Sequence, residues 1–185
     1  MPTLLTHPAV PLAMALGLGR EVISKRLLLA GIAVSILPDL DVIGFRIGIP
    51  YAAEFGHRGF SHSLLFAFCV AMVGALFYRR LDSTFHRALW FLFAAMASHS
   101  LLDSLTNGGL GVALLWPWSE HRFFAPLQVI EVSPISPSRF LSARGAEVIF
   151  SEVMWVWLPA LGIATVFAAS RTLSRKLETV PRDTN

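Results

Sequence analysis

The sequence has little charge for its length. Asp, Glu, Lys and Arg make up 15% of its 185 residues, against about 25% in soluble domains. Together with a hydrophobic share of 55% and a mean hydropathy of +0.62, this indicates a membrane protein. The single cysteine, Cys69, rules out a disulfide framework, and its position in an apolar run predicts a small buried side chain. The net charge is only +3 and no basic block alternates with aromatics, so nucleic-acid binding is not indicated.

The beginning of the chain lacks the basic residues that precede the apolar core of a cleaved signal peptide, because the first Lys or Arg is Arg20. We therefore expect a retained first helix over residues 7–19, with proline in its first turn. The last apolar run, 153–170, has no charge in 18 residues and is the clearest membrane span. Further apolar runs at 27–37, 63–78 and 88–97 complete the expected set of five membrane helices, an all-α bundle.

Two of these runs, 27–37 and 88–97, are shorter than the roughly 20 residues that span a bilayer. Either they continue through the polar residues that follow, or their helices are only partly inserted. The sequence leaves both alternatives open. We expect a single domain over residues 1–170 and a polar cytoplasmic tail over 171–185.

Three polar clusters interrupt the apolar runs. His57-Arg58-Gly59-Phe60-Ser61-His62-Ser63 holds two imidazoles and a guanidinium, although Ser61 or Ser63 could simply cap the next helix. Pro38-Asp39-Leu40-Asp41 places two carboxylates at a helix end, where Asp39 could be an ordinary N-cap. His99 and Asp103 are four residues apart, so on a helix they share one face and can chelate one ion.

Charge distribution predicts where these clusters lie. With an outer N-terminus, ten of the fifteen Lys and Arg residues fall in the expected cytoplasmic pieces, residues 20–26, 79–87 and the tail after 170, as the positive-inside rule favours. The candidate polar residues then all fall at the other, outer end: His7, Asp39, Asp41, His57, His62, His99 and Asp103. The loop-rich segment 110–148 lies at that end too, and we expect it to cover the site as a lid, with extended structure around 127–132.

These motifs, taken in order, resemble the YdjM family of membrane-bound metal-dependent hydrolases. The similarity rests on His7, the stretches 38–41, 57–63 and 99–109, and Trp116-Pro117-Trp118-Ser119. Ser61 stands where the family usually has threonine, which keeps a hydroxyl. The helical His-x-x-x-Asp arrangement is also distantly similar to zinc-dependent phospholipase C and single-strand nuclease folds. The resemblance implies a hydrolase bound to the inner membrane.

Our hypothesis for the chemistry is a two-ion centre that activates water against a phosphoester carried by a membrane lipid. Zinc suits mixed His and Asp ligation, and manganese or iron are alternatives. Arg58 would clamp the substrate anion, or else neutralise Asp39 or Asp41 in an ion pair. Glu120 and His121 are candidates to reach the site from the lid. The expected metal ligands are His7, Asp39, His62, His99 and Asp103, with Asp41 and His57 as further ligands or catalytic partners.

The competing hypothesis is a membrane protein without enzymatic activity, either a metal-binding scaffold or a transporter. A transporter should show polar residues at both ends or at mid-membrane, together with repeat symmetry. The sequence shows neither. A carboxylate ester or amide substrate stays an open alternative for the enzyme, and the sequence does not indicate an oligomeric state.

Overall fold

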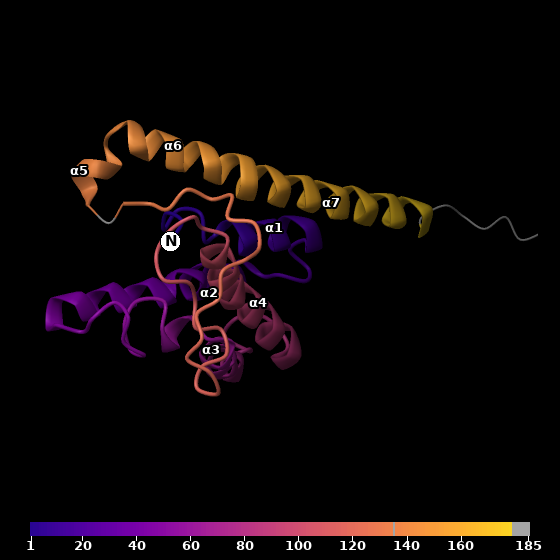
Figure 1. Cartoon of the computed structure of the whole chain (residues 1–185). Helices are drawn as coiled ribbons and strands as arrows, with labels where there is room; N and C mark the ends of the chain where they lie inside the picture. Colours follow the sequence, from indigo (N-terminus) through magenta and orange to yellow (C-terminus); the bar gives the residue numbers. More distant parts are fainter. Residues whose placement is uncertain (135, 179–185) are drawn as a thin grey trace, which may run out of the picture.

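The computed structural model describes residues 1–134 and 136–178, and these contain helices and isolated β-bridges but no β-strand. The expected all-α class is therefore confirmed (Figure 1). The tail prediction falls partly on residues 179–185, which lie outside the described residues. The helices are α1 (Ala9–Leu18), α2 (Lys25–Ile36), η1 (Leu37–Ile47), η2 (Phe60–His62), α3 (Leu64–Leu76), α4 (Phe85–Ser104), α5 (Pro137–Phe140), α6 (Ala143–Glu152), η3 (Val153–Trp157) and α7 (Leu158–Glu178).

Each predicted apolar run contains or overlaps a helix. α1 and α3 end slightly inside the predicted segments 7–19 and 63–78, whereas the other helices are longer than their runs. The last one begins near Ala143, ten residues before the predicted run, because the Ser142 side chain accepts a hydrogen bond from the backbone N–H of Arg144 and caps it. α4 covers 20 residues and continues through His99 and Asp103. α2 continues into the 3₁₀ helix η1, which contains the Pro38–Asp41 carboxylates. Both short runs therefore extend through their polar clusters, the first of the two alternatives.

Two helices of the described chain are long and apolar enough to cross a membrane. They are Lys25–Ile47, with 23 residues, and Ala143–Leu177, with 35 residues. With a rise of about 1.5 Å per residue in an α-helix and about 2.0 Å in a 3₁₀ helix, they reach about 40 and 52 Å, against a hydrocarbon core of about 30 Å. α1 and α3 are apolar but have only 10 and 13 residues. The expected crossing of five helices stays a prediction.

The main core forms where α4 packs between α2 and α3. Buried alanines at every fourth position of α3 let the two helices approach closely, and Leu27, Phe91 and Leu92 fill the space between them and α2. Cys69 lies on the opposite face of α3 and is exposed, so its expected burial was wrong. The buried alanines are Ala67, Ala71 and Ala75.

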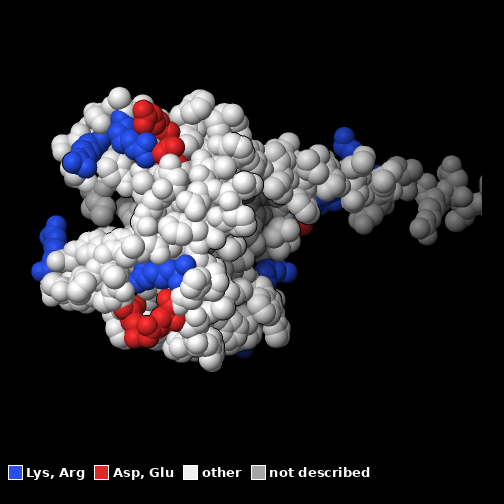
Figure 2. All heavy atoms as spheres, viewed as in Figure 1, with Lys and Arg blue, Asp and Glu red and all other residues white. Residues whose placement is uncertain are grey.

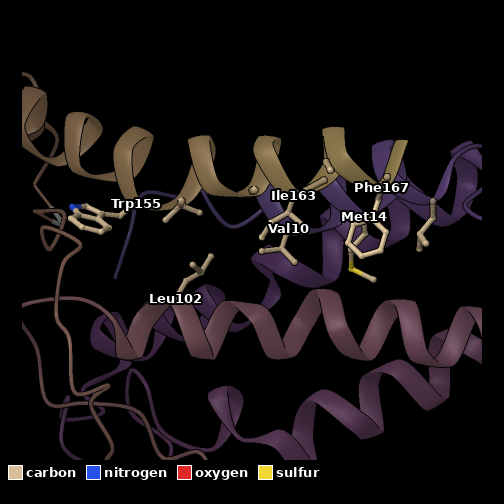
Figure 3. Close-up of a pocket in the computed structure, with 12 residues that line it drawn as sticks. Val10, Met14, Leu102, Trp155, Ile163 and Phe167 are labelled. Carbon is tan, nitrogen blue, oxygen red and sulfur yellow. The ribbon is translucent and has the colours of Figure 1, made fainter. Parts of the chain in front are cut away.

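The long C-terminal helix packs on α1 and leaves much of its apolar surface exposed (Figure 1). Only 11% of its most apolar window is buried within the structure. Between α1, α4 and α7 lies a cleft of about 400 Å³, which we call the α1–α7 cleft (Figure 3). Its walls are apolar throughout and include Val10, Met14, Leu102, Trp155, Ile163 and Phe167.

The chain's basic connections meet at one end of the helices. The Arg26 guanidinium pairs with Asp82 at 3.2 Å, and Arg87 and Arg175 both contact Glu21, through its carbonyl and its carboxylate respectively. The three segments predicted to share one side of the membrane are therefore neighbours. On the face drawn in Figure 2, charged side chains gather in a few groups and leave broad areas without charge, as a bilayer-facing surface requires.

Candidate metal centre

Four buried His and Asp side chains converge on one point, and we call them the His/Asp centre. Asp39 comes from η1, His62 from η2, and His99 and Asp103 from consecutive turns of α4. Each offers one ligand atom, and these four atoms lie within 4.8 Å of one another. His99 and Asp103 share one face of α4, as their spacing of four residues predicted. This is the face that η1 and η2 cover.

The distances in the His/Asp centre fit a tetrahedral ion. His62 Nε2 lies 3.0 Å from His99 Nε2 and 3.3 Å from Asp103 Oδ2. Asp39 Oδ1 lies 3.5 Å from His99 Nε2 and 3.9 Å from His62 Nε2. Ligands bound 2.0–2.2 Å from a tetrahedral zinc ion are themselves about 3.3–3.6 Å apart. The donor types and their spacing therefore suit zinc without a large rearrangement.

Hydrogen bonds on the far side of each ring direct both Nε2 lone pairs into the centre. His99 Nδ1 lies 2.8 Å from the carbonyl oxygen of Ser35, which can only accept, so Nδ1 carries the proton. His62 Nδ1 lies 3.2 Å from Asp41 Oδ2, which also accepts a hydrogen bond from Ser61 Oγ. An outer hydrogen bond of this kind is what orients metal-binding histidines.

The centre concentrates the buried polar atoms that have no hydrogen-bond partner. In the described residues, apart from Ser83 Oγ, every such side-chain atom belongs to His7, Asp39, Arg58 or Asp103. Both carboxylates have two such oxygens. Buried polar groups without partners are costly, so their collection at one point is the observation expected of a site for a cation.

His7 lies beside the centre rather than among its four converging atoms. Its ring stacks on the ring of His99, with 3.7 Å between centroids, and its Nε2 is 3.4 Å from Asp39 Oδ2. The side chain is fully buried. His7 therefore approaches the carboxylate oxygen of Asp39 that points away from His99, where it could complete a fifth position.

Asp41 and His57 form a second group that shares His62. His57 Nδ1 lies 2.6 Å from Asp41 Oδ1, and the other oxygen of this carboxylate faces His62 Nδ1. These three residues also meet the distance requirement for holding an ion. A neutral imidazole has only one nitrogen with a free lone pair, however. His62 therefore cannot serve both groups at once in its neutral form.

Arg58 is fully buried and its guanidinium is already engaged. Its Nε lies 3.1 Å from Asp103 Oδ2, while Nη1 and Nη2 donate to Gly108 O and Thr106 Oγ1 at 2.9 and 2.8 Å. This geometry favours the ion-pair alternative over a substrate clamp. The partner is Asp103, however, and not a carboxylate of the Pro38–Asp41 stretch.

Electrostatics at the centre favour positive charge. Burial alone would lower the pKa of His62, but hydrogen bonds to Asp103 and Asp41 raise its pKa to about 9. The carboxylates around His62 therefore favour a positive charge at the centre, whether as a proton on this ring or as a metal ion. A metal ion would take the place of such a proton and release it on binding.

The expected lid, residues 110–148, is only partly a loop, because α5 and the first part of α6 fall within it. Its loop part contacts the backbone of His57 and Arg58 beside the centre. Residues 107–134 contain no helix, and the Ala113 N–H donates to the carbonyl of Arg58 at 3.0 Å. Arg122 Nη1 donates to the carbonyl of His57 at 3.0 Å. Part of the expected extended structure is found, as an isolated bridge at Ile130.

Glu120 and His121 are not brought to the centre. Both are exposed, and the ring of His121 packs against Phe123 with 4.6 Å between centroids. The sequence did not reveal two residues that support the centre through hydrogen bonds in which one partner is a backbone carbonyl. Ser100 Oγ donates to the carbonyl of His62 at 2.7 Å, and Ser35 contributes only its carbonyl, for which no sequence signal exists.

Gly59 allows two backbone segments to approach each other closely. A Cβ at this position would lie 2.0 Å from the carbonyl oxygen of Glu54, so glycine is needed for this close backbone approach. Ser63, by contrast, is the N-cap of α3, as one alternative proposed, and accepts from Phe66 N–H at 3.1 Å. Asp39 caps no helix and its carboxylate faces the centre.

Fold and site together define an all-helical protein with apolar exposed helices and a buried His/Asp cluster able to hold a metal ion. The chain belongs to the YdjM inner membrane protein family, which matches residues 1–176. Inner membrane protein YbcI of Escherichia coli (strain K12) is 54% identical over 162 residues, covering 87% of this chain and 94% of that protein. No solved structure matches this chain.

Two shorter matches carry the family's name. Inner membrane protein YdjM of Escherichia coli (strain K12) and that of Shigella flexneri are each 38% identical to this chain over 110 residues. The aligned part is 54% of this chain and 53% of each relative. The names of the relatives place them in the inner membrane, and this chain is a membrane protein of their family.

Proposed function

We propose that this protein is a membrane-bound metal-dependent hydrolase that acts on a phosphoester carried by a lipid. The observation that carries the proposal is the convergence of two Nε2 lone pairs and two carboxylates in a buried centre. His and Asp donors suit zinc, and manganese or iron accept the same set. The resemblance of the sequence to metal-dependent hydrolases supports the reaction class.

The proposed centre holds one ion, bound by Asp39, His62, His99 and Asp103, with His7 adjacent. The sequence alone suggested two ions because it offered seven candidate ligands. The structure shows that the second group, Asp41 and His57, would need His62 as well. A neutral imidazole offers only one lone pair, so His62 cannot bind an ion in both groups. We therefore assign Asp41 and His57 a role other than metal binding.

That role is proton transfer. When bound, a divalent ion at such a site lowers the pKa of a coordinated water and polarises a phosphoryl oxygen. The Asp41 carboxylate holds the Nδ1–H of His57 at 2.6 Å, which leaves His57 Nε2 free to accept a proton. The second oxygen of the same carboxylate orients His62. Asp41 therefore contacts both the proposed base, His57, and a proposed metal ligand, His62.

A specific observation also favours a second candidate, a metal-binding scaffold without catalysis. Catalytic zinc sites keep one position open, whereas four protein ligands close a tetrahedral site. The four side chains of the His/Asp centre are almost completely buried. In the enzyme, access would require a higher coordination number or the displacement of one carboxylate.

Sidedness forms part of the proposal. The basic end of the helices, marked by the Arg26–Asp82 and Arg87–Glu21 contacts, would face the cytoplasm. The His/Asp centre would then lie at the outer face of the inner membrane, with the helix end around residue 176 in the cytoplasm.

The deciding experiment measures metal content and hydrolysis on the same preparations. Purified protein would be assayed against a panel of phosphodiesters and phospholipids, alongside the variants His57→Ala and His86→Ala. The enzyme hypothesis expects His57→Ala to keep its metal and lose turnover, while the exposed His86 serves as the matched control. Bound metal with no turnover across the panel would favour the scaffold.

A further inference from the structure

A second groove, separate from the α1–α7 cleft, touches the candidate site directly. It has a volume of about 400 Å³ and lies between η1, the loop that follows it and the first turn of α3. We call it the η1 groove. Its walls are mostly apolar, but Asp41 and Ser61 also line it. Its apolar lining includes Pro38, Leu40, Gly44, Ile47, Phe55 and Phe66.

The geometry of η1 explains why a groove forms there. A 3₁₀ helix has three residues per turn, so residues three apart lie one above the other. Pro38, Asp41, Gly44 and Ile47 therefore form one stripe, and all four line the groove. Gly44 contributes no side chain, which leaves the stripe hollow in its middle. The nearest atoms to a Cβ built at Gly44 belong to Ile49, at 3.5 Å.

The outer part of the η1 groove opens toward the bilayer. Leu40, Ile47 and Phe55 line it and are 55%, 73% and 55% exposed. η1 also belongs to one of the two candidate membrane spans, Lys25–Ile47. Exposed apolar side chains in such a segment contact lipid, so the material available to fill this groove is hydrocarbon.

The inner part of the groove is polar and continuous with the site. Ser61 Oγ donates to Asp41 Oδ2 at 2.7 Å, and Asp41 in turn contacts His57 and His62. The α1–α7 cleft has a similar volume, but no residue of the site lines it (Figure 3). Of these two, only the η1 groove joins a hydrocarbon-facing mouth to the polar atoms of the candidate site.

We infer that the η1 groove binds the hydrocarbon chain of a lipid, with the lipid's phosphoester held toward Asp41 and His57. This inference rests on the proposed function for the identity of the bond that is cleaved, whereas lipid binding itself does not depend on catalysis. It names the substrate class as a long-chain lipid rather than a water-soluble phosphodiester.

Gly44→Leu tests the groove, because a leucine there fills the hollow of the stripe at a site where a Cβ meets only ordinary contacts. The matched control is Ala160→Leu, which adds three carbons to the α1–α7 cleft, one fewer than Gly44→Leu adds to the η1 groove. The probe is a phospholipid with a diazirine on its acyl chain, reconstituted with the full-length protein. Labelled peptides are identified by mass spectrometry, and metal content confirms that each variant is folded.

We expect wild type and Ala160→Leu to be labelled within residues 37–66, and Gly44→Leu to lose most of that label. Uniform labelling of all exposed helices, or label retained in Gly44→Leu, would overturn the inference. Either result would mean that the probe reports only the non-specific lipid contacts of any membrane protein. In the activity arm, Gly44→Leu should reduce the preference for long-chain over short-chain substrates by about tenfold, as displacing two buried methylenes would do.

The two arms separate the groove from the proposed function. Selective labelling without hydrolysis of any substrate by the wild type supports the groove and counts against the enzyme. Hydrolysis with the same chain-length preference in wild type and Gly44→Leu supports the enzyme and overturns the groove.

Discussion

His62 Nε2 and His99 Nε2 lie 3.0 Å apart, while each ring's Nδ1 faces a hydrogen-bond acceptor on its far side. Two neutral rings held this way would point lone pairs at each other, which is repulsive. A proton or a metal ion must therefore lie between the rings. With Asp39 and Asp103 completing the set, a divalent cation satisfies the arrangement better than one proton does.

Metal content is the first prediction. Purified protein should hold about one divalent ion per chain, and His99→Ala or Asp103→Ala should lose most of it, because each removes one of four ligands. Elemental analysis by mass spectrometry measures this. The exposed His86 and His121 provide the matched controls, since alanine at either should leave the ion in place. Two ions per chain would return Asp41 and His57 to the ligand set.

Chelation should destabilise the protein. Removal of the ion leaves both carboxylate oxygens of Asp39 buried without a hydrogen-bond partner, and Asp103 is then compensated by Arg58 and His62. An ion present at 1,000 times its Kd stabilises the fold by about 4 kcal/mol, which corresponds to a Tm difference of about 8–16 °C for a chain of this size. Thermal melts with and without a chelator measure the shift. His99→Ala should melt alike in both conditions, and an unchanged Tm for the wild type would count against the centre.

Arg58→Lys separates a structural arginine from a substrate clamp. Lysine keeps the charge but cannot reach Asp103, Gly108 and Thr106 together in the geometry of a guanidinium. We expect stability to fall by about 1–3 kcal/mol for each buried acceptor left unpaired, together with weaker metal retention. Activity per bound metal ion should stay near that of the wild type. A ten- to hundredfold loss of catalytic efficiency with full metal content would instead assign Arg58 to the substrate.

Glu152 should matter for stability although it lies outside the centre. Its buried carboxylate accepts hydrogen bonds from the hydroxyls of Thr3 and Thr6, both at 2.7 Å, in the segment that leads to His7. Glu152→Ala removes the acceptor of both hydroxyls, while Thr6 Oγ1 still accepts from Trp157 Nε1–H at 3.2 Å. The loss should cost about 1–3 kcal/mol in the free energy of unfolding for each buried donor left without an acceptor. The control is Glu147→Ala on the same helix, where the side chain is 61% exposed and the expected change is within about 0.5 kcal/mol. Equal effects of the two variants would contradict this account.

Topology is testable with an impermeant thiol reagent. In a Cys69→Ser background, a cysteine at the exposed position of His86 should be labelled from the cytoplasm and one at Glu120 from the opposite side. Labelling of both from the same side would reject the proposed orientation and the location of the centre at the outer face.

The sequence predicted the helices and much of the cluster, because apolar runs and a spacing of four residues are local signals. The His99 and Asp103 pair could be placed on one helix face without knowing the fold. The partner of Arg58 could not be predicted, since it depends on how Thr106 and Gly108 fold back over residues distant in sequence. The carbonyl of Ser35, which accepts from His99 Nδ1, could not be predicted either. Every residue has a carbonyl, and only tertiary packing determines which one faces His99.

Sequence reasoning placed the start of the last helix ten residues too late for a related reason. The predicted run 153–170 was defined by the absence of charge, and Arg144, Glu147 and Glu152 all precede it. In the structure, Arg144 pairs with Glu147 on the exposed side and Glu152 turns inward to the threonines. These polar side chains are paired within α6 or with the N-terminal segment, and a hydropathy profile contains no information on such pairing.

The His/Asp centre also sets an order of events during biosynthesis. Its donors are distributed along the chain, with Asp39 in η1, His62 in η2, and the remaining two near the end of α4. A nascent chain that has emerged only to residue 90 has Asp39 and His62 but lacks half of the site. Capture of an ion by all four donors would therefore await insertion of α4, which would make metal loading a late checkpoint for correct assembly in the membrane.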